Sequence, residues 1–275
     1  MPELPEVETA RRDLNRLLKG KRIQKFRILH PALLRNATPE EFLESLEGKR
    51  ILGTGRRGKY LLLLLEGGAA LAVHFKMTGR FFLLEQEKDL PKHTHLVMAL
   101  EGKTYLCYSD IRKFGRIYLL KGGEEEEPDE IRLLGLDPLG EEFTLEAFRG
   151  LTGSRKEIKR LLLEQHLIAG IGNIYVSEIL WRAGIRPERS ASSLSGDEIA
   201  RLFRAIPEVL KTAVASGGST LRDRTYLRVD GTPGSYQKFH KVYYRTGLPC
   251  TVCGEAIEKS LVAKRSSFFC PRCQK

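Results

Sequence analysis

The first residues of the chain offer an unusual nucleophile. Proline is the second residue, so removal of the initiator methionine would leave Pro2 with a free secondary amine. Attack of such an amine on the anomeric carbon of a sugar gives an iminium ion, which is positive without a proton and can withdraw electrons during later eliminations. The positive end of a helix beginning here disfavours the ammonium form of the amine. Pro2 is therefore a candidate nucleophile, although a proline that only begins a helix is the commoner use of this residue.

Four of the five cysteines form two pairs near the C-terminus. Cys250 and Cys253 make one Cys-x-x-Cys pair, Cys270 and Cys273 make the other, and sixteen residues separate the pairs. This spacing is typical of one tetrahedral zinc site, in which metal binding supplies the folding energy of a short segment. Four thiolates leave no position for water, so the zinc would be structural. Two redox dithiols, or cysteines without a metal, are the alternatives, and Cys107, in an apolar strand, is expected to be a core residue.

The charge of the chain favours nucleic acid as a partner. There are 46 Lys and Arg residues against 35 Asp and Glu, a net charge of +11, and residues 238–275 hold eight basic residues and two glutamates. Phosphate neutralisation and counterion release make such a surface suited to nucleic acid.

The N-terminus has no signal-peptide pattern, and the leucine run Leu61–Leu65 is too short to span a bilayer. We therefore expect the protein in the cytosol, without a membrane partner.

The elements that must position these groups can be read from the spacing of apolar residues. Helical spacing runs from Glu3 to about Lys19, and Gly20 can end that helix. Between Ile23 and about Leu120, short β-like runs separated by glycine turns predict a sandwich or barrel. The runs include Arg50–Gly55, Tyr60–Glu66, Ala70–Phe75, His95–Leu100, Thr104–Ser109 and Arg116–Leu120.

A change of composition separates this β-rich part from a helical part. The acidic run Glu124–Glu127 and the sequence Asp137-Pro138-Leu139-Gly140 predict a linker over residues 124–140. We expect an N-terminal domain over residues 1–123, a helical domain over residues 141–237 and a zinc module over residues 238–275.

Two helix starts and one long loop are predicted in the helical part. Ser154-x-x-Glu157 and Ser195-x-x-Glu198 both fit a capping box, and Pro207 is expected to bend the second helix. Residues 217–235 are rich in glycine and small polar residues and lack periodicity, which indicates an ordered or mobile loop.

Four separated motifs stand out along the chain: PELPEVET from Pro2, RGKY over Arg57–Tyr60, GIGNIYVSE over Gly170–Glu178, and the four-cysteine segment with Lys264-Arg265 inside it. With these motifs the chain resembles the formamidopyrimidine-DNA glycosylase family across nearly its whole length. The resemblance implies an α+β multidomain fold. Its parts would be an N-terminal β-sandwich with an N-terminal helix, a helix-two-turn-helix domain containing residues 155–185, and a C-terminal zinc-finger β-hairpin.

The activity implied by this resemblance is that of a bifunctional glycosylase and AP lyase. It would remove 8-oxoguanine and formamidopyrimidines from damaged double-stranded DNA as a monomer, with one structural Zn²⁺ as cofactor, at the bacterial nucleoid. By the match, Pro2 is the nucleophile at C1′, Glu3 is the general acid/base, and Glu6 supports the site. The iminium then permits β- and δ-elimination, which leave a one-nucleotide gap.

The resemblance also assigns residues that hold DNA. Lys59, Asn173 and Arg265 match the clamp on the phosphates beside the lesion. Lys59 and Arg265 could instead be solvated surface residues, and Gly-x-Gly-Asn, which contains Asn173, could be an ordinary turn. His74 is a further candidate phosphate ligand, with an ordinary interior histidine as the alternative.

Three residues match those that fill the space left by the extruded base: Met77, Arg112 and Phe114. From residue type alone, Met77 and Phe114 would be core residues at strand ends. The chain departs from the family here, because Phe75-Lys76 stands where Leu-Gly is usual and Ile111 where proline is usual.

The loop that contains Gly218, Ser219 and Thr220 resembles the segment that covers an extruded 8-oxoguanine. An uninvolved flexible loop is the alternative.

Two other functions also remain open: an endonuclease VIII-like glycosylase for oxidised pyrimidines, and a zinc-containing protein that binds damaged DNA without catalysis. Leu4 and the Arg112/Phe114 pair favour the purine branch, but the sequence does not rank the substrates.

Overall fold

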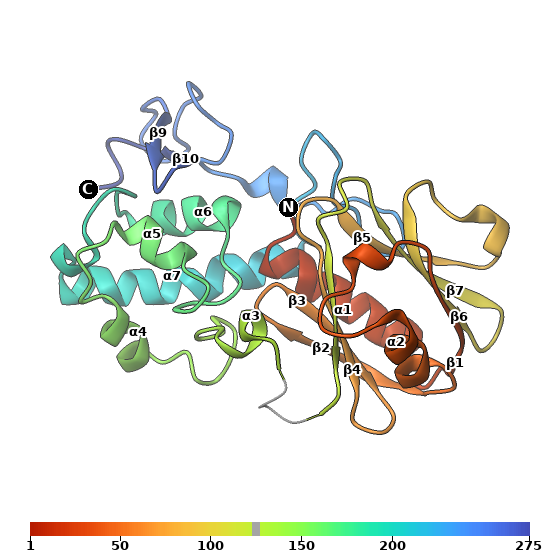
Figure 1. Ribbon diagram of the computed structural model, residues 1–275. Helices are drawn as coiled ribbons and strands as arrows, with labels where there is room; N and C mark the ends of the chain where they lie inside the picture. Colours follow the sequence, from red (N-terminus) through yellow and green to blue (C-terminus); the bar gives the residue numbers. More distant parts are fainter. Residues whose placement is uncertain (123–126) are drawn as a thin grey trace. The chain divides into compact units, whose positions relative to one another are not determined.

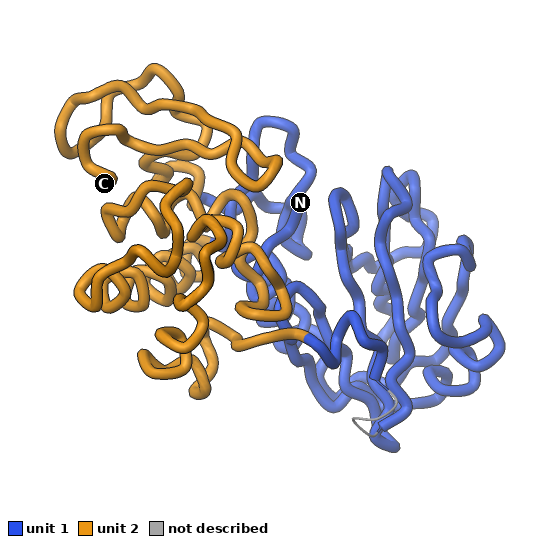
Figure 2. Tube along the Cα trace, turned by 60° about the vertical axis from the view of Figure 1, so that its left-hand side comes forward, with its two compact units in different colours: residues 1–133, 217–235 blue, residues 134–216, 236–275 orange. Residues whose placement is uncertain are grey.

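The computed structural model describes residues 1–122 and 127–275 (Figure 1). Of the predicted acidic run, Glu124–Glu126 lie outside the described residues. The chain divides into two compact units, one of residues 1–133 and 217–235, the other of residues 134–216 and 236–275 (Figure 2). The 217–235 segment therefore belongs to the first unit, although it follows the helices of the second in sequence. The domain limits at residues 123, 140 and 237 stay predictions.

The first unit begins with helix α1 (Leu4–Leu18), close to the helix predicted from Glu3 to about Lys19. Glu3 is the N-cap in a capping box: its side chain accepts from the Glu6 N–H, and the Glu6 side chain accepts from the Glu3 N–H. Two N–H groups that a helix start leaves without backbone partners are satisfied in this way. Leu4, Val7 and Leu14 on the apolar face are fully buried.

Two four-stranded antiparallel sheets follow among the described residues, and they share one core with α1 and α2 (Pro39–Leu46). This confirms the sandwich prediction. The first sheet has the order β1 (Ile23–Ile28), β6 (Thr94–Leu100), β7 (Thr104–Asp110), β5 (Gly79–Leu84). The second has the order β2 (Ile51–Arg57), β3 (Tyr60–Leu65), β4 (Ala70–His74), β8 (Arg116–Leu120). Short helices are η1 (Pro31–Leu33), η2 (Glu87–Asp89) and α3 (Asp129–Arg132).

The register of the second sheet positions two of the predicted site residues. Arg57 pairs with Tyr60, so Gly58 and Lys59 form a two-residue turn, and Gly58 takes a φ of +55° that favours glycine. Tyr60 in turn pairs with His74 on β4, and their rings meet edge to face at 4.7 Å. Lys59 and His74 therefore lie at the same end of the sheet.

The second unit contains the predicted helices and a hairpin. Its elements are α4 (Leu145–Leu151), α5 (Ile158–Leu163), α6 (Asn173–Ala183), η4 (Ala191–Ser193), α7 (Gly196–Ala215), η5 (Tyr236–Phe239), β9 (Glu258–Val262) and β10 (Arg265–Phe269). Ser195 caps α7, as predicted, with its hydroxyl accepting from the Glu198 N–H at 3.2 Å. Pro207 lies inside this helix. None of the described helices is long and apolar enough to cross a membrane.

The helix N-cap predicted at Ser154 is wrong. Helix α5 begins at Ile158 with Glu157 as its N-cap, not at Ser154. The reason is that this stretch is held in an extended pairing: Glu157 forms a bridge with Ser190, and the Ile158 N–H donates to the Arg189 carbonyl at 2.7 Å. Tertiary pairing thus overrides the local capping signal.

Glu8 is the centre of an ion cluster in α1. Arg11, Arg12 and Arg56 donate to its carboxylate at 2.8 to 3.1 Å. Burial alone would raise the pKa of Glu8, but hydrogen bonds from Arg11 and Arg12 and the nearby guanidinium charges lower it to about 2. A carboxyl with a lowered pKa stabilises the folded state above its unfolded pKa, and this contribution is lost as the pH falls toward 2.

We predict that Glu8→Gln lowers the free energy of unfolding at pH 7 by about 3 kcal/mol, because three guanidinium groups lose their shared partner. Urea unfolding at several pH values measures this, and the difference from wild type should shrink below about pH 4. Glu41→Gln, which removes an exposed partner of Lys121, is the matched control and should change little. An equal loss in both variants would contradict the assignment.

Candidate functional site

The N-terminal residues and the 217–235 segment meet at Glu6. One carboxylate oxygen of Glu6 accepts from the Glu3 N–H at 2.8 Å, and the other accepts from the Ser219 N–H at 2.7 Å. Glu3 and Glu6 are 3% and 1% exposed, so this contact is shielded from water. Pro2 is also buried. Met1 precedes it here, so the Pro2 nitrogen is part of a peptide bond in this form of the chain.

The predicted loop residues form the root of the 217–235 segment. Gly218 has a φ of +78°, and a Cβ there would lie 2.7 Å from a Glu6 oxygen, so only glycine fits. The Thr220 hydroxyl donates to the Tyr226 carbonyl at 3.0 Å and accepts from the Gly234 N–H at 2.9 Å. Gly218, Ser219 and Thr220 are all buried.

His74 and Lys59 form a second part of the site in the first unit. The His74 Nδ1 accepts from the Lys76 N–H at 3.0 Å, so a neutral His74 ring carries its proton on Nε2. Burial, together with the charges of Lys76 and Lys59, keeps the pKa of His74 well below its usual value. His74 is therefore a neutral N–H donor at pH 7, near the Lys59 ammonium.

The three residues assigned to fill the space of an extruded base lie on two loops of the first unit. Met77 and Phe114 are 36% and 51% exposed, so the interpretation of these two as core residues is wrong. The Arg112 guanidinium lies over the Phe114 ring at 4.6 Å. Ile111, at the position where the family usually has proline, is also exposed.

Sequence reasoning missed the residue that joins these two loops. Asp110, fully buried at the end of β7, accepts from the Thr78 hydroxyl, from the Arg112 N–H at 3.2 Å and from the Gly115 N–H at 2.7 Å. One carboxylate thus holds the loop after β4 against the loop after β7. An aspartate at a buried strand end was the only signal, and it is common in proteins without such a role.

The second unit holds the other predicted phosphate ligands around its hairpin. The Asn173 side chain donates to the Ser266 carbonyl at 3.1 Å. Lys159, which the sequence analysis did not single out, is fully buried and donates to the same carbonyl at 2.8 Å and to the Ser267 hydroxyl at 2.7 Å. These donors fix the strand beside the exposed Arg265.

The four paired cysteines are brought together as predicted. Their sulfur atoms all lie within 4.8 Å of one another, with 3.4 Å between Cys253 and Cys270 and 3.9 Å between Cys250 and Cys273. Thiolates around a tetrahedral zinc ion are separated by similar distances. Burial opposes ionisation, but N–H groups of Val252 and Cys253 lower the pKa of Cys250 to about 6. The cluster fits one structural zinc ion, and Cys107 is buried apart from it.

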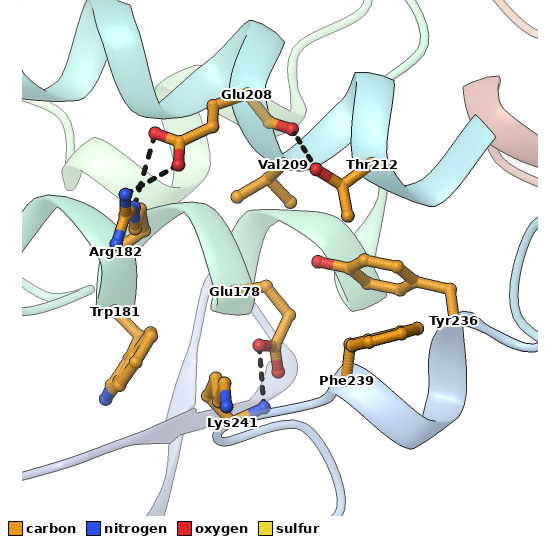
Figure 3. A pocket seen from close by; sticks show the side chains of 9 residues that line it. All are labelled: Glu178, Trp181, Arg182, Glu208, Val209, Thr212, Tyr236, Phe239 and Lys241. Atoms are coloured by element: carbon orange, nitrogen blue, oxygen red, sulfur yellow. Dashed lines mark hydrogen bonds and ion pairs between the residues drawn. The ribbon is translucent and has the colours of Figure 1, made fainter. Parts of the chain in front are cut away.

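A cavity of about 190 Å³ lies elsewhere in the second unit, between α6, α7 and the segment around η5 (Figure 3). Glu178 on its wall accepts from the N–H groups of Lys241, Val242 and Tyr243 at 2.8 to 3.1 Å. These contacts fasten the start of the 238–275 segment to α6. None of the predicted site residues lines this cavity, and we assign it no chemistry.

These features define a class of proteins that join a β-sandwich with an N-terminal proline to a helical unit carrying a four-cysteine zinc finger. The formamidopyrimidine-DNA glycosylase N-terminal domain matches residues 1–117, the H2TH domain of the same family matches residues 134–225, and the zinc finger found in FPG and IleRS matches residues 247–275. The chain belongs to the formamidopyrimidine-DNA glycosylase family.

Relatives of known name cover the whole chain. It is 46% identical over 275 residues to the formamidopyrimidine-DNA glycosylase of Thermus thermophilus, covering 100% of this chain and 98% of that protein. The solved T. thermophilus structure superposes with a TM-score of 0.89 over 99% of this chain and 98% of that one, at 46% identity. A complex of Lactococcus lactis Fpg with DNA containing an abasic site gives a TM-score of 0.90 at 38% identity over 99% of each chain.

We predict that Cys253→Ser loses most of its bound zinc, because three thiolates and a hydroxyl bind the ion far less well than four thiolates. Metal analysis of the purified protein measures this, with about one zinc ion per chain expected for wild type. Cys107→Ala serves as the control, since it removes a thiol that lies outside the cluster. Wild-type zinc content in Cys253→Ser, or equal loss in both variants, would reject the site.

Proposed function

We propose that this protein is a bifunctional DNA glycosylase and AP lyase of base excision repair, which removes oxidised purines from duplex DNA through an adduct on Pro2. The observation that carries the proposal is the Glu6 carboxylate, which bonds both to Glu3, beside the proposed nucleophile, and to Ser219 in the proposed lesion loop. The Glu6 side chain thus holds both the start of the chain, where the Pro2 nitrogen must attack the sugar, and the 217–235 segment, which must cover the base.

The reaction requires the chain without Met1, since only then is the Pro2 nitrogen an amine. This nitrogen forms a bond to C1′ while the bond between C1′ and the base breaks, and the base leaves with a proton. Opening of the sugar ring at O4′ gives an iminium ion. Loss of a C2′ proton then breaks the C3′–O bond, and a second elimination breaks the C5′–O bond. Glu3 gives and takes the protons, because its carboxylate lies next to the amine in the chain.

Damaged double-stranded DNA is the proposed partner, and the neutral and charged donors have separate roles. Lys59 and Arg265 supply positive charge to the phosphates beside the lesion, while His74 and Asn173 supply uncharged N–H donors. Met77, Arg112 and Phe114 fill the gap that the extruded base leaves in the base stack of the DNA. They are accessible for this role because they lie on exposed loops. The crystallised complexes of L. lactis Fpg include a DNA with Fapy-dG and a DNA with an oxidised pyrimidine. We further propose that the protein acts at the bacterial nucleoid.

We predict that borohydride traps the protein, with Met1 removed, on duplex DNA carrying 8-oxoguanine opposite cytosine. Reduction converts the iminium into a stable amine, so the complex survives denaturing electrophoresis. Pro2→Gly should trap far less, because a primary amine at a flexible glycine replaces the fixed secondary amine.

The same gel separates the alternatives. Wild type that binds the lesion without any trapping would point to a damage-binding protein without catalysis. Faster trapping on oxidised pyrimidines than on 8-oxoguanine would favour the endonuclease VIII-like function. Lys49→Gln, which changes a partly exposed charge in the loop before β2, is a control that should trap like wild type.

A further inference from the structure

Helix α1 carries a stripe of polar side chains on one face, formed by Glu6, Thr9 and Asp13. Their spacing of three and four residues places them in one line along the helix. All three are less than 9% exposed. Buried polar groups need partners, and a stripe of them on a helix indicates that something polar packs there. The 217–235 segment supplies partners for Glu6 and Asp13.

Two residues of the stripe hold different points of the segment. Glu6 accepts from the Ser219 N–H at 2.7 Å, whereas the Thr9 hydroxyl donates to the Pro5 carbonyl of its own helix at 2.8 Å. Asp13 receives two bonds from one guanidinium, from Arg228 Nε at 3.1 Å and from Arg228 Nη2 at 2.9 Å. The paired geometry is the strongest that arginine and a carboxylate form. The first bond lies beside the nucleophile, and the last lies two helical turns away.

These contacts divide the segment into two fixed legs and a tip. The first leg is residues 217–220. The second is residues 226–234, where Tyr226 and Val229 are buried and the Arg228 N–H and Thr232 carbonyl bond at 2.9 Å. Between them, residues 222–224 are exposed. Within the described chain, the hydrogen bonds of the tip, residues 222–225, run to residues 221–225.

We propose that the Asp13–Arg228 ion pair is a latch that sets the position of the second leg, and thereby of the tip that covers an extruded oxidised purine. Asp13 and Arg228 are then positioning residues for recognition of the base. This inference rests on the proposed function. Because an abasic site has no base to cover, the latch should matter for base excision and not for cleavage at a site whose base is already gone.

The first test compares Arg228→Gln with wild type in single-turnover assays on two DNA substrates. We expect excision of 8-oxoguanine to be about tenfold slower, because two charge-assisted hydrogen bonds are lost. Cleavage at an abasic site should stay within about twofold of wild type, since that step does not use the tip. Asp13→Arg combined with Arg228→Asp should recover part of the excision rate.

A matched control lies on the same helix. Arg16 has a side chain that is 73% exposed and lies 3.9 Å from Asp13, so Arg16→Gln removes the same charge but leaves the latch intact. It should leave the ratio of the two rates unchanged. An equal fall of both rates in Arg228→Gln would mean a general structural role and overturn the proposal, as would two unchanged rates.

Hydrogen exchange without DNA tests the latch independently of the chemistry. Backbone amides of residues 226–234 should exchange faster in Arg228→Gln than in wild type, while those of β6 should not. Equal exchange in the two proteins would overturn the latch. If wild type cut neither substrate while exchange responded as expected, the proposed function would fail and the latch would stand.

Discussion

The Glu6 carboxylate constrains the arrangement of the first unit more than any other group. Its two oxygens accept from two backbone N–H groups that are 216 positions apart in sequence, Glu3 and Ser219. Each bond satisfies a buried N–H group. Leaving a buried N–H group without a hydrogen bond costs about 1 to 3 kcal/mol. The geometry also demands glycine at position 218, because a Cβ would meet the carboxylate. The start of α1 and the root of the 217–235 segment can therefore move only together.

Buried carboxylates recur as fixing points in the first unit. Glu8 gathers three arginines, Asp110 joins the loops that carry Met77 and Phe114, and Asp13 holds Arg228. In a chain with a net charge of +11, carboxylates inside the fold leave the excess of positive charge for the surface. The same division serves DNA binding, since exposed cations attract phosphate while buried anions keep the loops in position.

Sequence patterns were sufficient where the signal is local. The helix at the N-terminus, the sheets and the four-cysteine cluster follow from spacing of three or four, alternation, and paired Cys-x-x-Cys. Strands β1 and β5 were not among the named runs, and the Ser154 cap was wrong because a pairing with residues 189–190 overrides it. Lys159, Asp110 and Arg228 could not be found from the sequence. Each has a hydrogen-bond partner at least 32 positions away in the sequence. A lysine, an aspartate or an arginine is also usually a surface residue.

The chemistry depends on α1 presenting the nitrogen of Pro2 to the sugar. The most direct measurement is to reduce the adduct with borohydride on DNA containing 8-oxoguanine, digest DNA and protein, and locate the attached sugar by mass spectrometry. We expect the added mass on the peptide Pro2–Arg11, at its N-terminal nitrogen and with Met1 absent. Attachment to the side chain of Lys59, or to a peptide that still begins with Met1, would contradict it.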